Sequence, residues 1–173
     1  MNTVTATGRV RYATGTFTRP ADTTAYTAGD VMNNSASAGV VTEIPNVGLS
    51  AHASTIIQQA ICVDSANQAT KPDLELWLFD TAVTADNDNA VFTPTDAELR
   101  TLVAVIAFPS TSFKAGDATS GAGGNCVCDI QNLGIPVRVT GTQVDSLYGV
   151  VVVRNAYTPV SAERFDFFLK LID

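Results

Sequence analysis

The chain has 173 residues, of which 46% are hydrophobic, so it can bury a sizeable core in one domain and is not generally disordered. Only 16% of the residues are charged and the formal net charge is −7, which excludes broad binding to nucleic-acid phosphates. No run approaches the ~18 apolar residues that span a membrane, and the first 30 residues lack the apolar core of a secretory signal. We therefore expect synthesis in the cytoplasm, no membrane partner and no direct nucleic-acid partner.

The first residues mix small, polar and apolar side chains without a core pattern, which predicts an extended N-terminal arm over residues 1–16. A single β-sandwich domain over residues 17–173 is expected to follow it. The first 21 residues carry Arg9, Arg11 and Arg19 and no acidic residue, whereas the other 152 residues carry 7 basic and 17 acidic ones. This asymmetry makes the three arginines candidates for binding an acidic patch on another protein.

Short apolar runs bounded by turn residues predict strands along the rest of the chain. In chain order they cover residues 31–32, 40–44, 52–63, 74–79, 102–108, 127–130, 135–139, 147–154 and 164–172, with Asn132-Leu133-Gly134 as a turn between two of them. One short helix is expected near residues 95–100, because Thr95 and Glu98 have the spacing of a capping box. This pattern predicts an all-β fold, an antiparallel β-sandwich or jelly roll.

The strand at residues 74–79 is apolar on both faces, with leucines at 74, 76 and 78 on one face and Trp77 and Phe79 on the other. We expect this strand to be central and covered on both sides, with Trp77 in the core. The strand at residues 164–172 is also apolar on both faces, whereas a two-layer sandwich covers only one face of each sheet. The surplus predicts self-association, with a homotrimer as the first expectation and a homodimer as the second.

No motif predicts catalysis, so we expect a protein that is not an enzyme and has no catalytic residue, cofactor or metal. The three cysteines, at positions 62, 126 and 128, are interpreted as small buried hydrophobic residues. His52 is the only histidine, too few for a zinc site. Asp86-Asn87-Asp88-Asn89 offers oxygens to calcium but lacks the glycine and distal glutamate of an EF-hand, so an exposed turn is expected there. Paired carboxylates for glycoside hydrolysis stay open, because their separation is set by the fold.

Two stretches carry a resemblance to a known family: residues 17–31, from Phe17-Thr18-Arg19-Pro20 to Gly29-Asp30-Val31, and Leu76-Trp77-Leu78-Phe79-Asp80 together with residues 88–99. Leu147-Tyr148-Gly149 and Tyr157-Thr158-Pro159 also fit. The chain resembles small virion proteins of tailed bacteriophages that are made alongside the major capsid protein.

This resemblance implies a non-enzymatic capsid decoration, or cement, protein. Such proteins are β-rich oligomers on the outer surface of the virion, made in the host cytoplasm, that bind and stabilise the shell of major capsid protein. Two alternatives stay open. One is a spike or fibre jelly-roll module that binds host carbohydrate, for which exposed aromatic residues beside polar groups are the discriminating feature. The other is a component of the head–tail connector.

Overall fold

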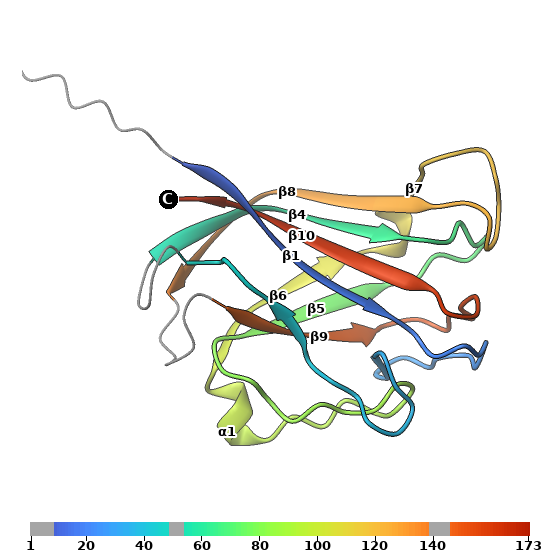
Figure 1. The fold of residues 1–173 in the computed structure, drawn as a ribbon, viewed down its shortest axis with the longest axis horizontal. Helices are drawn as coiled ribbons and strands as arrows, with labels where there is room; N and C mark the ends of the chain where they lie inside the picture. The colour runs from blue at the N-terminus through green and yellow to red at the C-terminus, as the bar shows by residue number, and fades with distance from the viewer. Residues whose placement is uncertain (1–8, 49–53, 139–145) are drawn as a thin grey trace, which may run out of the picture.

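The computed structural model describes residues 9–48, 54–138 and 146–173. Two antiparallel sheets are stacked on one another (Figure 1). The first sheet holds, in spatial order, β1 (Val10–Thr18), β10 (Arg164–Ile172), β4 (Ser54–Asp64), β8 (Cys126–Arg138) and β7 (Lys114–Ala115). The second holds β2 (Val31–Met32), β9 (Leu147–Val153), β5 (Leu74–Phe79) and β6 (Leu102–Phe108), and β3 (Thr42–Ile44) also pairs with β9. The predicted antiparallel β-sandwich is confirmed, and the jelly-roll topology stays a prediction.

The main core lies between the two sheets and is built by the inward-facing residues of both. On β10 the alternation is regular: Phe165, Phe167, Leu169 and Leu171 are buried, and the residues between them are more exposed. Such alternation is what a sheet with one face on a core requires. All seven residues of β9 are buried, which indicates that the second sheet is covered on both faces.

The outer face of the second sheet is covered by the chain's own loops, which lie below β5 and β9 in Figure 1. Phe79 and three residues of β9 form a smaller apolar cluster there, against which Trp77 and Phe92 pack. The Trp77 and Phe92 rings meet edge to face, with 5.1 Å between their centroids. The prediction that β5 is central and covered on both sides is confirmed, although Trp77 is half-buried in this outer cluster. Since the cover comes from within the chain, β5 needs no partner subunit.

The single α-helix of the described residues, α1 (Asp96–Leu99), begins where the capping box predicts. The Thr95 hydroxyl accepts a hydrogen bond from the Glu98 N–H at 3.2 Å, and the Glu98 carboxylate accepts one from the Thr95 N–H at 2.8 Å. Hydrogen bonds from the backbone N–H groups of Thr95 and Thr84 lower the pKa of Glu98 to about 2. A 3-10 turn, η1 (Ser110–Ser112), follows β6.

β1 begins at Val10, so the predicted boundary at residue 16 falls inside a strand, and the expectation of an arm is wrong for residues 10–16. Of the buried positions of β1, Phe17 is large, whereas Ala13 and Gly15 are small, and Ala13 and Phe17 both belong to the core. A Cβ atom on Gly15 would lie 2.7 Å from Cγ1 of Ile44 on β3, so this close approach requires glycine. These small residues hide the core pattern of β1 in the sequence. Residues 1–8 lie outside the described residues.

β8 runs through the turn that the sequence predicts at residues 132–134. Its register with β4 jumps from the pair Gln59–Gln131 to the pair Ile57–Ile135, so three residues of β8 stand opposite Gln58 alone. Asn132 and Gly134 adopt positive φ angles of 59° and 61°, which let the chain bulge and then resume pairing. The prediction of two strands separated by a turn is therefore corrected to one bulged strand.

Candidate functional site

The fold separates the three arginines that the sequence groups as candidate partner-binding residues. Arg9 is exposed at the start of β1. Arg11 forms a bidentate ion pair with Asp173, with 2.7 Å from Nε to Oδ2 and 2.8 Å from Nη2 to Oδ1. Arg11 also donates to the backbone carbonyl oxygens of Asn46 and Val47. It therefore ties β1 to the end of β10 and to the turn after β3.

Arg19 is 2% exposed and belongs to a buried polar cluster. Its Nε donates to the Tyr26 hydroxyl, and its Nη2 donates to Asp88 Oδ2 at 2.9 Å. The Tyr26 hydroxyl and the Asn33 N–H both donate to the other oxygen of Asp88. An arginine that is buried and paired inside its own chain cannot reach a second protein, so the expectation for Arg19 is corrected. Its charge fastens the segment around Asp88 to the end of β1.

The Asp86–Asn89 segment uses its oxygens inside the chain. Asp88 is buried with Arg19, the Asp86 carboxylate accepts from the N–H and hydroxyl of Thr93, and the Asn87 side chain accepts from the Gly39 N–H. The expected exposed turn is therefore wrong for Asp88. Among the described residues, no group of three or more His, Cys, Asp and Glu side chains is placed to hold a metal.

A second buried polar cluster contains two carboxyl groups, Asp64 and Glu163, which are 0% and 1% exposed. They share a hydrogen bond, and the Tyr157 hydroxyl donates to Glu163 Oε1 at 2.6 Å. The Ala66 N–H and the Cys126 thiol donate to the two oxygens of Asp64, at 2.7 and 3.5 Å. Burial, followed by the neighbouring Asp64 carboxylate, raises the pKa of Glu163 to about 8, and burial also raises the pKa of Asp64. At neutral pH the pair therefore holds a proton between its two carboxyl groups.

This pair does not have the geometry of the paired carboxylates that hydrolyse glycosides. Hydrolytic carboxyl groups stand about 5–9.5 Å apart on either side of a sugar bond. Asp64 and Glu163 are instead in hydrogen-bond contact and shielded from solvent. Their geometry fits a structural role, in which a shared proton allows two carboxyl groups to be buried side by side.

The three cysteines are free and buried, which confirms their interpretation as small core residues. Burial, followed by the Asp64 charge, raises the pKa of Cys126 to about 12, and burial raises the pKa of Cys128 to about 11. Because the thiolate is the reactive form, both side chains are chemically inert while the protein is folded. His52 lies outside the described residues.

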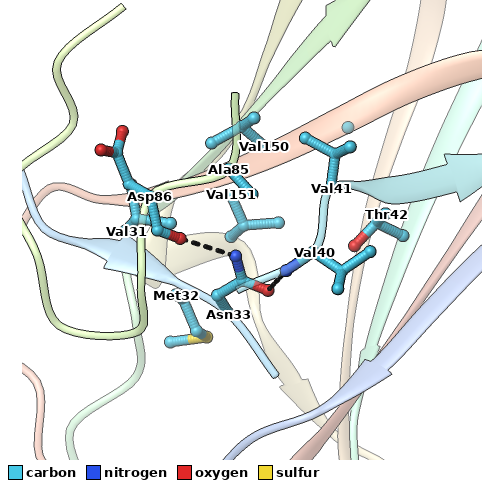
Figure 2. Close-up of a pocket in the computed structure, with 11 residues that line it drawn as sticks. Val31, Met32, Asn33, Val40, Val41, Thr42, Ala85, Asp86, Val150 and Val151 are labelled. Carbon is cyan, nitrogen blue, oxygen red and sulfur yellow. Dashed lines mark hydrogen bonds between the residues drawn. The ribbon is translucent and has the colours of Figure 1, made fainter. Parts of the chain in front are cut away.

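Figure 2 shows a small cavity between β9, the segment from β2 to β3, and Asp86. The Asn33 side chain spans its wall, donating to the Asp86 carbonyl oxygen at 2.8 Å and accepting from the Val40 N–H at 3.4 Å. The cavity volume of about 10 Å³ has room for roughly one water molecule. It is therefore too small to be a ligand site.

β1 forms one edge of the first sheet and lacks most of the features that normally blunt such edges; its one charged residue, Arg11, is paired with Asp173. It pairs with β10 and with no other strand in the part of the chain that the structure describes. Its nine residues contain no proline, lysine or bulge. Toward the opposite edge, by contrast, β8 carries the bulge at residues 132–134 and Pro136. An unblunted edge offers backbone N–H and C=O groups to a strand of another chain.

The outer face of the first sheet, which points away from the core, begins with an apolar row. Register pairs join Val10 to Ile172, Ile172 to Ile56, and Ile56 to Pro136. Val10 is 55% exposed and Ile56 is 43% exposed. β10 thus keeps the apolar second face from which self-association was predicted, and the homotrimer and homodimer stay predictions.

The next row across the same four strands is polar. It joins Tyr12, Lys170, Gln59 and Gln131 through successive register pairs, and Tyr12 is 59% exposed. Beside Tyr12 lies an open hollow of about 360 Å³, here called the amide hollow, which is lined by Gln58, Gln59, Gln131, Asn132 and Lys170. The amide hollow is not predicted from the sequence, because residues 52–63 have the pattern of a regular strand. Two consecutive glutamines inside an alternating strand were the available signal.

No protein-family model matches this chain, and a search of curated proteins finds no match. In the described residues, no helix is long and apolar enough to cross a membrane.

Proposed function

We propose that the protein is a capsid decoration (cement) protein of a tailed bacteriophage, which binds the outer surface of the major capsid protein shell and stabilises it without catalysis. The observation that carries the proposal is the unblunted edge of β1. Strand addition to such an edge gives affinity through main-chain hydrogen bonds without requiring a deep pocket. The resemblance of residues 17–31, 76–80 and 88–99 to phage virion proteins supports the class of protein.

The charge distribution supports attachment through this edge better than attachment through a basic arm. Arg11 and Arg19 are paired within the chain, so Arg9 is the exposed member of the three. One exposed ion pair contributes about 0–1 kcal/mol and is screened by salt. Main-chain pairing along β1, repeated over a shell, would give a stronger attachment that salt weakens little.

The test is to add purified protein to shells of major capsid protein that lack it, and to measure occupancy by cryo-electron microscopy. The double variant Thr14→Lys and Thr16→Lys places two charges on exposed positions of β1, which should block strand addition and lower occupancy at least tenfold. The matched control is Thr23→Lys with Thr111→Lys, at exposed positions away from this edge. Both variants should melt like the parent protein.

Full occupancy by the β1 variant would contradict attachment through this edge. Density for the chain at a fibre tip would favour the carbohydrate-binding spike. Density at the portal would favour the head–tail connector. Both alternatives stay predictions.

A further inference from the structure

The amide hollow exists because two bulges meet in the middle of the first sheet. Gln58 has no register partner on either side: pairing with β10 jumps from Lys170–Gln59 to Leu171–Ile57, and on β8 residues 132–134 loop out opposite it. In a regular strand, consecutive side chains point to opposite faces. Here the bulge places Gln58 and Gln59 against the same hollow. Bulges re-aim side chains in this way and are frequent beside binding sites.

Internal hydrogen bonds hold two of the amides in position. Asp129 Oδ1 accepts from Gln59 Nε2 at 2.7 Å, and Asp129 Oδ2 accepts from Gln131 Nε2 at 2.7 Å. One carboxylate thus fixes both amide groups by their N–H₂ ends. The carbonyl oxygens of Gln59 and Gln131 are then oriented as acceptors before any ligand arrives. Such preorganisation lowers the entropic cost of binding.

The chemistry of this row favours a neutral ligand that carries many hydroxyl groups. Amide side chains act as donors and acceptors, Lys170 adds a donor, and the Lys170 and Asp129 charges cancel. Tyr12 contributes an exposed ring with an apolar face and a polar hydroxyl. From Tyr12 to Gln131 the row crosses three strand spacings, roughly 14 Å. That length exceeds one sugar ring and suits a short oligosaccharide lying across the strands.

We propose that Tyr12 and the amide hollow form a binding site for a neutral oligosaccharide. Tyr12 stacks on the apolar face of one sugar, and Gln59, Gln131 and Lys170 hydrogen-bond to hydroxyl groups of the next. This site goes beyond attachment to a capsid and does not depend on it. It can therefore be tested on the isolated protein.

The experiment is isothermal titration calorimetry of the full chain with four neutral trisaccharides: maltotriose, cellotriose, N-acetylated chitotriose and mannotriose. At least one trisaccharide should bind with a dissociation constant of about 10 mM or below, as expected for an open site with few contacts. Tyr12→Ala and the double variant Gln59→Ala with Gln131→Ala should each weaken binding at least tenfold. The control is Gln68→Ala, which removes a glutamine that bonds the Thr158 carbonyl oxygen outside this row.

Three results would overturn the proposal. The first is that none of the four sugars binds. The second is that the parent binds no more tightly than Tyr12→Ala and the double glutamine variant. The third is that the Gln68→Ala control loses as much binding as those two variants. Light scattering on the same samples tests the competing explanation, which is that this polar row is an interface between copies of the chain. That explanation is correct if Tyr12→Ala dissociates an oligomer and no sugar binds. A melting curve is recorded for each variant. If the double glutamine variant is unfolded, Tyr12→Ala on the edge strand alone tests the proposal.

Discussion

Replacing Glu163 by glutamine should remove most of the pH dependence of stability between pH 5 and pH 8. Native Glu163 keeps its proton up to about pH 8, whereas in the unfolded chain a glutamate releases it near pH 4.5. Between these values the native state binds one more proton, so raising the pH destabilises it by about 1.4 kcal/mol per pH unit. Because the extra proton is only partly bound near the two pKa values, the loss from pH 5 to pH 8 is about 3–4 kcal/mol. That is a large part of the ~5–15 kcal/mol that stabilises a typical domain.

Glutamine keeps the shape of the side chain and has no proton to lose. Its N–H₂ group can donate to Asp64 and its carbonyl oxygen can accept from Tyr157, as the protonated glutamate does. The variant should therefore match the parent within about 1 kcal/mol at pH 5 and exceed it by about 3–4 kcal/mol at pH 8.

Urea unfolding followed by circular dichroism at half-unit pH steps from pH 5 to pH 8.5 measures this difference. Acidic groups with lowered pKa values, such as Glu98 and Asp173, lose their contribution only as the pH falls below this range. The matched control is Asp166→Asn, a carboxyl-to-amide change on the surface pair with Arg164. Parallel pH profiles for the parent and Glu163→Gln would refute the assignment of a shared proton to this pair.

Three further results are expected. Arg19→Leu should lower the free energy of unfolding by about 3–5 kcal/mol, because it leaves the Asp88 charge buried without its partner; a change below 1 kcal/mol by urea unfolding would contradict this. Deleting residues 1–8 should leave the melting temperature within about 2 °C of the parent, whereas deleting residues 1–16 removes most of β1 and should abolish cooperative melting in calorimetry. Trp77→Ala should cost about 3 kcal/mol by urea unfolding, the lower end of the range for large aromatic residues, because Trp77 is half-buried against Phe92; an unchanged midpoint would show that this contact is dispensable.

The parts of the fold that the sequence predicted are those in which local signals agree. Residues 102–108 and 164–172 have the predicted bounds, because the continuous apolar run of the first ends at Pro109 and the alternating run of the second begins after a turn. The helix start was predictable because its signal is local: the two residues of the capping box, Thr95 and Glu98, are only three positions apart. β1 was missed because its packing depends on Gly15, a residue that signals nothing without the β3 strand against it.

The candidate site was less predictable, because its determinants join distant parts of the chain. Arg19 is paired with Asp88, a residue 69 positions away. The sequence gives no sign of this pairing, so Arg19 was predicted to be available to a partner. The amide hollow combines residues of β4, β8 and β10, and it depends on register jumps that no propensity encodes. The adjacent Gln58 and Gln59 break the alternation of their strand, which is the one local trace of the site.

The pairing of β1 with β10 has a consequence for how the protein is made. Val10 pairs with Ile172, so the first described strand must wait for the last one before its sheet can be completed. At a synthesis rate of ~5–20 residues per second, this delay is about 8–30 s on the ribosome. Throughout that interval both edges of β1 and its valine and phenylalanine side chains are open to other nascent chains. When many such chains are synthesised at the same time, aggregation competes with the late, non-local pairing of β1 with β10. We therefore expect the yield of recombinant protein to depend on temperature and on chaperone supply.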